Sequence, residues 1–474
     1  MAQTIFSRTN ESPHDRLDRF LFEGQADDRQ QRQRQWQRQQ PSFSNATTTR
    51  LVTSSPCLLE QLKCNQIQEL QLSSTQATNL DWQALLQAIQ QNRSVQTVRV
   101  HGFFVDQYLL TSNPTMVDMF WKALGKLPRL KELHFLYFLD APLVLESLAE
   151  ILGLAKNLEK VCFHDIQLSL DATNTSENNK QHYDLLLARH SKLKVVYMTK
   201  ISVSSRGGSN RNLDSWMQLW TSAPKLQKLV LQMSRPSAGR SQRLVFTQQH
   251  MDRLSQMTCL KVLDIRAADL NNACVEHLMQ SLTTKTSGTT KHPSLLGVTL
   301  KDLALNINES TTKDQAASIL AICQVLERNT TLETLHVGSN RMDESDWISL
   351  MQALHYNRSL KALHLHQDEH NDSENCAIHS ARVQEAILDM LRRNCYLTSL
   401  YSTDMSNSGT LEVFGLVDFY LQMNATCIRR LLLDINVNRE QILDKLFVHA
   451  DRLDYLYHIL RGNPLFVLQD SYYY

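Results

Sequence analysis

A six-residue pattern of apolar and polar positions, apolar-x-x-apolar-x-apolar, recurs along most of the chain. Two examples are Ile67-Gln-Glu-Leu-Gln-Leu72 and Leu130-Lys-Glu-Leu-His-Phe135. Its twelve copies begin at Ile67, Val95, Leu130, Leu158, Leu193, Leu226, Leu260, Leu295, Leu332, Leu360, Leu397 and Ile428. Successive copies start 28 to 37 residues apart. A repeat of that length predicts a solenoid, in which each unit buries its apolar face against its neighbours only.

Each copy of the pattern predicts a short strand, and the residues that follow it predict a helix. Positions 1, 4 and 6 of the strand face the core, and positions 3, 5 and 7 face the other way. In the first repeat Trp82, Leu85, Leu86 and Ile89 have the spacing of one apolar helical face. Alternating strands and helices predict an α/β fold, a right-handed horseshoe with a parallel inner sheet and outer helices.

An asparagine stands three residues before several predicted strands. These residues are Asn92, Asn329, Asn357 and Asn394. Asparagine tolerates the left-handed backbone conformation that ends many helices. We therefore expect each of them to end a helix in that conformation.

The strand pattern resembles that of leucine-rich-repeat proteins, L-x-x-L-x-L-x-x-N/C-x-L. The repeat length resembles that of their long-repeat, ribonuclease-inhibitor-like subclass. The asparagine of the consensus is matched at Asn340, while Thr75, Phe103 and Phe138 occupy that place elsewhere. Because this asparagine normally bridges backbone groups between turns, its scarcity predicts a less regular solenoid. The resemblance implies the fold and not one function, because this fold carries many functions.

The sequence divides into three predicted parts. Residues 1–55 are rich in glutamine and arginine, with five arginines and no acidic residue from Arg29 to Arg50, which predicts a disordered leader. This leader is either a flexible extension or a basic arm for nucleic acid or an acidic protein. Residues 56–438 form the solenoid. Residues 439–474 hold two short helical stretches that we expect to cap its last repeat, followed by a tail.

Composition places the chain in a reducing compartment. Its nine cysteines are scattered and lack CxxC spacing, which is unlike a disulfide framework. The N-terminal residues have no apolar signal core, and no segment reaches membrane-spanning length. We expect a cytoplasmic protein, with the nucleus as the alternative.

The formal charge of the chain is only +1, yet basic residues gather locally. Between Arg189 and Met251 there are eleven basic residues and one acidic residue, Asp214. Five arginines of this zone fall in two insertions that follow strands, so we expect them to cluster on one edge, called here the loop rim: Arg206, Arg211, Arg235, Arg240 and Arg243. Such a basic rim favours an acidic protein partner over nucleic acid, because few aromatic residues are interleaved; a merely solvated rim is the other alternative.

Positions 5 and 7 of the strands predict the concave face, where aromatic, histidine and arginine side chains are the types that anchor partners. The candidate partner-binding residues are Arg99, His134, Tyr197, Arg266, His336, His364, His366 and Tyr401. His336, His364 and His366 should converge from neighbouring strands, near Asp368, Glu369 and His370. These are zinc-ligand types, but no spacing matches a zinc signature, so we expect a polar contact patch with no bound metal.

Catalytic motifs are not found in the sequence. It has no GxGxxG after a strand, no GxxxxGK[ST], no GxSxG and no HExxH. We expect a protein-recognition scaffold without enzymatic activity, without a cofactor and without a small-molecule substrate. Within the family that the chain resembles, the alternatives are regulatory subunits: a substrate adaptor of a ubiquitin ligase or a small-GTPase activator. An immune-type sensor would need a nucleotide-binding module, for which the sequence has no motif.

Overall fold

The structure is a computed structural model. It describes residues 55–73, 81–102, 114–138, 151–169, 192–204, 217, 220–221, 223–233, 244–266, 268–283, 296–307, 312–339, 342–367, 377–402, 411–426 and 429–430. Contacts divide the chain into residues 1–54 and 55–474, so all described residues belong to the second unit. The predicted leader and the predicted C-terminal cap at 439–474 lie outside the described residues.

Eleven strands form one open, parallel sheet in the order in which they occur along the chain. They are β1 (Glu69–Leu72), β2 (Thr97–His101), β3 (Glu132–Phe138), β4 (Lys160–Ser169), β5 (Val195–Ser204), β6 (Lys228–Met233), β8 (Val262–Asp264), β10 (Asp302–Ile307), β11 (Thr334–Ser339), β12 (Ala362–Gln367) and β13 (Ser399–Ser402). Each strand pairs only with the preceding and the following repeat, which is the topology of a solenoid. The predicted α/β leucine-rich-repeat fold is therefore confirmed.

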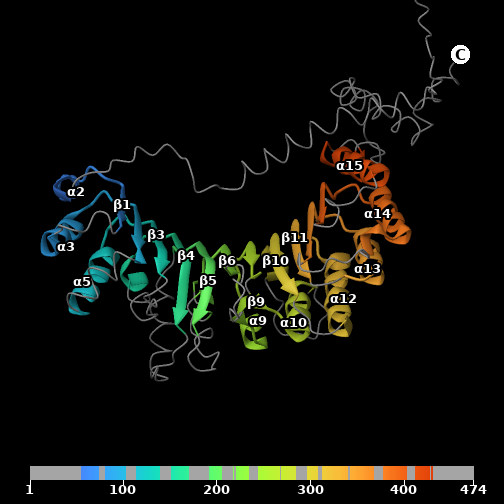
Figure 1. The fold of residues 1–474 in the computed structure, drawn as a ribbon, viewed down its shortest axis with the longest axis horizontal. Helices are drawn as coiled ribbons and strands as arrows, with labels where there is room; N and C mark the ends of the chain where they lie inside the picture. The colour runs from blue at the N-terminus through green and yellow to red at the C-terminus, as the bar shows by residue number, and fades with distance from the viewer. Residues whose placement is uncertain are drawn as a thin grey trace, which may run out of the picture. The chain divides into compact units, whose positions relative to one another are not determined.

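The helices lie on one side of the row of strands (Figure 1). They are α2 (Ser55–Lys63), α3 (Trp82–Gln91), α5 (Pro114–Gly125), α9 (Gln248–Ser255), α10 (Asn272–Thr283), α11 (Leu296–Thr299), α12 (Thr312–Arg328), α13 (Glu344–Leu354), the 3-10 helix η3 (Ala377–His379), α14 (Ala381–Arg393) and α15 (Leu411–Ala425). Neighbouring helices contact each other, as α10 contacts α12 and α12 contacts α13. A short parallel pair, β7 (Leu244–Val245) and β9 (Ala268–Asp269), lies outside the main sheet and was not predicted.

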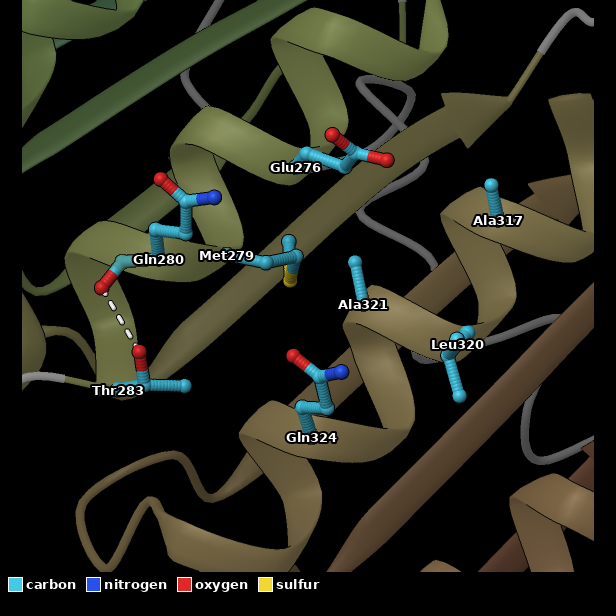
Figure 2. A pocket seen from close by; sticks show the side chains of 8 residues that line it. All are labelled: Glu276, Met279, Gln280, Thr283, Ala317, Leu320, Ala321 and Gln324. Carbon is cyan, nitrogen blue, oxygen red and sulfur yellow. Dashed lines mark hydrogen bonds between the residues drawn. The ribbon is translucent and has the colours of Figure 1, made fainter.

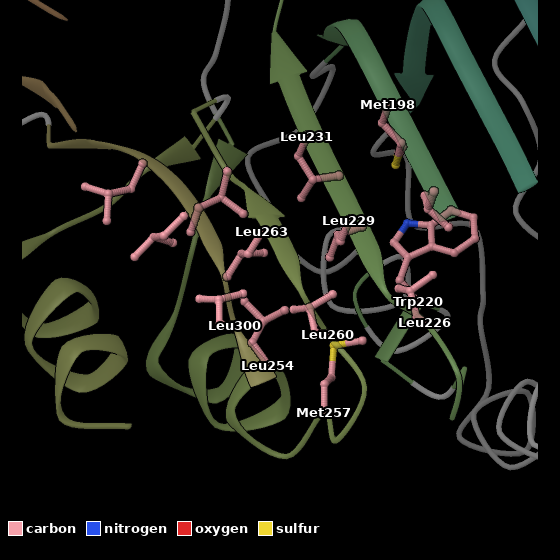
Figure 3. Close-up of a cluster of buried hydrophobic side chains, with 14 of the residues drawn as sticks. Met198, Trp220, Leu226, Leu229, Leu231, Leu254, Met257, Leu260, Leu263 and Leu300 are labelled. Carbon is pink, nitrogen blue, oxygen red and sulfur yellow. The ribbon is translucent and has the colours of Figure 1, made fainter. Parts of the chain in front are cut away.

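The strand pattern explains the core. Leu130, Leu133 and Phe135, at positions 1, 4 and 6 of the third copy, are fully buried. The ring of Phe135 stacks on that of Phe163 in the next repeat, with centroids 5.0 Å apart. Figure 3 shows the same arrangement farther along, where leucines of β6 and β8 pack toward Leu254 of α9. The core is thus one continuous column of equivalent positions.

The first helix after a strand shows why these residues are helical. The carboxylate of Asp81 caps α3 by accepting hydrogen bonds from the backbone N–H of Gln83 and Ala84, at 3.0 and 3.2 Å. Leu85, Leu86 and Ile89 of the predicted apolar face are buried, whereas Trp82 is only half-buried. The spacing of the apolar residues therefore gives the buried face correctly.

The eighth strand is a correction to the predicted register. The pattern that starts at Leu295 predicts a strand there, but residues Leu296–Thr299 are helical and β10 begins at Asp302. The true copy is Leu300-Lys-Asp-Leu-Ala-Leu305, five residues later. Both frames contain Leu300, but only the later one buries its apolar positions: Leu303 and Leu305 are buried, whereas Val298 of the earlier frame is 66% exposed. Positions 5 and 7 of the later frame are Ala304 and Asn306. The earlier frame, which would put Thr299 and Lys301 at these positions, was wrong.

The twelfth predicted strand, from Ile428, lies largely outside the described residues. Arg429 and Arg430, the two residues of that copy that are described, are helical. Arg429 is buried, and its guanidinium donates to the backbone oxygens of Leu391 and Asn394 at the C-terminal end of α14. A cation at this end of a helix satisfies carbonyl groups that have no partner within the helix.

The asparagines before the strands do not take the predicted left-handed conformation. Asn92 (φ −70°, ψ 137°) and Asn394 (φ −85°, ψ 117°) are extended, and neither Asn329 nor Asn357 has a positive φ. Each side chain instead bridges two repeats. The Asn394 carbonyl oxygen accepts from the N–H groups of Tyr396 and Leu397, and its amide donates to the Leu354 and Asn357 oxygens of the preceding repeat. This bridging fixes the turn without a left-handed residue.

Candidate functional site

Sheet register brings the predicted concave residues together in rows. At position 5, Arg99 pairs with His134, which pairs with Cys162 and then Tyr197. Farther along, Ala304 pairs with His336, His364 and Tyr401 in turn. Neighbouring strands lie about 4.8 Å apart, so side chains in one row contact each other. The face is thus a continuous surface built from one or two residues of each repeat.

The C-terminal half of this face carries four rings, called here the histidine cluster: His336, His364, His366 and Tyr401. The His336 and His364 rings stack with centroids 4.2 Å apart and planes 11° from parallel. The His366 ring lies 6.4 Å from that of His336 and 5.7 Å from that of Tyr401. The predicted convergence of three imidazoles is therefore observed, and it includes the phenol of the next strand.

A charged network borders the histidine cluster. Both guanidinium contacts of Arg266 go to the carboxylate of Asp264, at 2.7 and 3.0 Å. The side-chain amide of Gln232 donates to the same carboxylate at 2.7 Å. Ala304 separates Asp264 from His336 in the position 5 row. Arg266 is close enough to influence all three imidazoles electrostatically.

The imidazoles of the cluster are held in the neutral state. Burial, followed by the charge of neighbouring His364, lowers the pKa of His336 from its ordinary 6.5 to about 4. Burial also lowers the pKa of His364 and of His366, with Arg266 adding to the effect in both. The Nδ1 atom of His336 is buried and has no hydrogen-bond partner among the described residues. At neutral pH the cluster therefore offers uncharged rings with hydrogen-bonding edges.

The stacking of these rings is unsuited to a shared metal ion. The lone pair of an imidazole nitrogen lies in the plane of its ring, so rings that stack face to face do not aim their lone pairs at one point. Within the described part of the chain, no group of three His, Cys, Asp or Glu side chains is arranged to hold a metal. The neighbouring Asp368, Glu369 and His370 lie outside the described residues.

The N-terminal half of the face is more strongly tied by internal contacts. Arg99 forms an ion pair with Glu69 at 2.8 Å. His134 is buried and contacts the Glu132 carboxylate at 3.2 Å, and burial lowers its pKa. Tyr197 lies under the ammonium group of Lys228, which is 5.0 Å from the ring centroid. His134 is thus a structural part of this surface, whereas Arg99 and Tyr197 are accessible.

Sequence reasoning missed Tyr137 as part of this surface. Its ring stacks with His101 at 5.8 Å and meets His164 edge to face at 5.9 Å. Tyr137 has φ 59°, and Asp165 and Lys200 at the equivalent place in the next two strands also have positive φ. These residues bulge out of the strand pairing, which turns a side chain beyond position 7 onto the face. Because bulky residues rarely take this conformation, nothing in the sequence indicated the bulge.

Thiol chemistry is disfavoured on the concave face. Cys162, which stands between His134 and Tyr197, has its pKa raised to about 11 by burial. The thiolate is the reactive form of cysteine, so this side chain is a poor nucleophile at neutral pH. Burial likewise raises the pKa of Cys323 on α12 to about 12.

A shallow groove of about 240 Å³ lies on the helical side, between α10 and α12 (Figure 2). Met279, Ala317 and Ala321 form its floor and walls, and Leu320 beside them is 57% exposed. Glu276 is the one titratable side chain of its lining. The groove has no pair of acid and base groups, so it does not resemble a catalytic centre.

The loop rim cannot be placed, because Arg206, Arg211, Arg235, Arg240 and Arg243 lie outside the described residues. Among the described helices, none is both long enough and apolar enough to cross a membrane.

Comparison with known proteins found similarity among solved structures alone. No family model matches the chain, and no curated protein matches it. Among solved structures, the chain is similar to leiomodin-1 actin-binding site 2, with 18% identity over 38% of this chain and 90% of that one and a TM-score of 0.30. It is also similar to the protein of a TLR13–ssRNA13 complex, with 13% identity over 66% of this chain and 42% of that one and a TM-score of 0.32. Neither likeness bears on function at these identities and TM-scores.

Proposed function

We propose that the chain is a protein-recognition module that binds its partner on the concave face, with the histidine cluster as the anchoring patch. The observation that carries this proposal is the set of stacked rings on β11, β12 and β13 beside Arg266. Histidine, tyrosine and arginine side chains held by their neighbours lose little conformational freedom on binding, which favours affinity. Tyr401 is 40% exposed, so the cluster is accessible from solvent.

The environment of the cluster supports this proposal. Neutral imidazoles carry little desolvation cost compared with charged ones, so an interface can bury them without a counter-ion. Ala304 and Gly338 are the small residues at positions 5 and 7 beside the cluster. The added Cβ of an alanine at 338 would lie 2.3 Å from the Asn306 side-chain oxygen, so the small residue here keeps Asn306 in place.

The finer assignments rest on the sequence pattern. A helix between most neighbouring strands of the described residues and repeats of 28 to 40 residues support membership of the ribonuclease-inhibitor-like subclass. The proposal includes the division into a leader at 1–55, a solenoid at 56–438 and a cap at 439–474. It also includes a cytoplasmic or nuclear location. The basic side chains of the loop rim would form further contacts with acidic side chains of the partner.

A capture experiment with two matched triple variants tests the concave face. The concave variant carries His336→Ala, His364→Ala and Tyr401→Ala. The control carries three exposed changes on the helical side: Leu320→Ala, Gln324→Ala and Tyr356→Ala. Affinity capture from native lysate, quantified by mass spectrometry, should show proteins that the wild type and the control retain and the concave variant loses at least tenfold. Retention of every captured protein by the concave variant would refute the proposal.

A further inference from the structure

The turns that lead into four neighbouring strands form a basic edge, called here the turn rim. These turns are residues 128–131, 156–159, 192–194 and 224–227, which directly precede β3, β4, β5 and β6. They hold six basic side chains, Arg129, Lys131, Lys156, Lys192, Lys194 and Lys225. Their single acidic side chain is Glu159, so six minus one gives a local charge of +5 in a chain whose total is +1.

Backbone hydrogen bonds hold the turn rim in register. The N–H of Glu159 donates to the oxygen of Lys131 at 2.8 Å, and the N–H of Lys194 donates to the oxygen of Glu159 at 2.8 Å. The N–H of Gln227 continues the series by donating to Lys194 at 2.7 Å. With strands about 4.8 Å apart, the charges follow a line about 14 Å long whose backbone is rigid. The turn rim lies at the beginnings of the strands.

Most of these charges are free to meet a ligand. Five of the six basic residues are exposed and Lys194 is half-buried. Lys194 pairs with Glu159 at 3.0 Å, and Lys192 donates to the side-chain oxygen of Asn157 at 2.6 Å. The other four make no ion pair among the described residues: Arg129, Lys131, Lys156 and Lys225.

A hollow of about 340 Å³ lies within the turn rim and gives it a receptive shape. It is lined by Arg129, Lys131 and Lys192 together with Gln96, Pro128, Asn157 and Glu159. Asn157 is fixed there because its amide donates to the oxygen of Pro128 at 2.7 Å. An anionic side chain entering this hollow would meet three cations and one carboxylate, that of Glu159, which is already paired with Lys194 at 3.0 Å.

We propose that the turn rim binds an acidic polypeptide segment, rich in aspartate and glutamate, as a second contact surface separate from the concave face. A segment in extended conformation rises about 3.3 Å per residue, so four to five residues would span the line of charges. Nucleic acid fits less well. The four turns contain no aromatic ring on which a base could stack. Five of the six cations are lysines, whereas arginine is the side chain that recognises phosphate in two-pronged fashion.

Two variants of equal charge separate a specific site from a general charge effect. The rim variant removes the four unpaired cations by Arg129→Gln, Lys131→Gln, Lys156→Gln and Lys225→Gln. The control variant removes four exposed cations of helices by Lys63→Gln, Arg328→Gln, Arg382→Gln and Arg392→Gln. Both variants have the same net charge, and circular dichroism should confirm that both keep the wild-type fold.

Fluorescence anisotropy with a labelled glutamate-rich peptide measures binding to the full-length chain at low and at physiological salt. We expect the rim variant to bind at least about tenfold more weakly, or about 1.4 kcal/mol, and the control to stay within about twofold. The affinity of the wild type should fall as salt rises. A labelled oligouridine of equal length is the competing probe. No binding of the peptide at low salt, equal losses in both variants, or tighter binding of the RNA than of the peptide would each overturn the proposal. The concave triple variant should bind the peptide normally, which separates failure here from failure of the concave-face proposal.

Discussion

The bridging asparagines make a quantitative prediction about how the repeats hold together. Asn394 is 2% exposed and makes four hydrogen bonds through its side chain. An Asn394→Ala change leaves the N–H groups of Tyr396 and Leu397 and the oxygen of Asn357 without these partners. Each buried group left unpaired costs about 1 to 3 kcal/mol, and Tyr396 is half-buried, so solvent relieves part of its cost. We expect the free energy of unfolding to fall by about 3 kcal/mol.

Urea denaturation followed by circular dichroism measures this loss, and hydrogen exchange locates it. Because each repeat contacts only its neighbours, the amide of Leu397 should exchange faster while amides near β2 are unaffected. Asn157→Ala is the control, because this half-buried asparagine also makes two side-chain hydrogen bonds, to Pro128 and from Lys192. Solvent can replace both, so we expect the control to cost less than about 1 kcal/mol. A loss in Asn394→Ala as small as that of the control would refute the bridging role.

Three further outcomes are expected. His336 stays neutral in the folded protein down to about pH 4 but is protonated near pH 6.5 in the unfolded chain. The free energy of unfolding should therefore fall by about 1 to 2 kcal/mol between pH 6.5 and pH 4, after allowance for solvent screening. Urea midpoints at pH 7 and pH 5 should show a smaller loss in the His336→Gln variant than in the wild type. A Gly102→Ala change puts Cβ 2.3 Å from the backbone oxygen of Tyr137, so thermal unfolding should show a loss of stability of about 3 kcal/mol. Gly415 lies in α15 with open space around it, so Gly415→Ala should stabilise the protein by about 0.5 to 1 kcal/mol. Equal effects of the two changes would contradict the packing. Arg429→Met should cost about 2 to 3 kcal/mol in urea denaturation by leaving carbonyl oxygens of α14 unpaired, and a change below 0.5 kcal/mol would contradict that role.

The sequence pattern predicts most of the fold because each repeat obeys the same two periods. The strand period of two gives the buried Leu133 and Phe135 of β3 and their counterparts, and the helical period gives the buried face of α3. The pattern failed at Leu295, where two overlapping frames share Leu300. A pattern of apolar positions cannot choose between such frames. The choice depends on which frame buries more apolar surface against both neighbouring repeats, and this is a tertiary effect.

The candidate site was predictable only as far as strand register goes. His336 and His364 occupy the same position in neighbouring strands, and His366 follows two residues after His364 on the same face. Their proximity can therefore be predicted by counting positions in the sequence. The stacking of their rings and the burial of His134 depend on neighbouring side chains. The turn rim could also be read from the sequence in part, since Arg129, Lys192 and Lys225 each stand directly before the first leucine of a copy. The apolar pattern places one leucine in each of these turns but carries no information about the charged residues beside it.

Photocrosslinking at single positions tests the central claim, that a protein partner docks on the concave face. A photoreactive phenylalanine derivative at position 401 replaces an exposed tyrosine of β13, and the same group at position 320 replaces an exposed leucine of α12 on the helical side. Irradiation of the full chain in native lysate should join a discrete protein to position 401 and none to position 320. Adducts at position 320 alone, or the same adducts at both positions, would contradict recognition by the concave face.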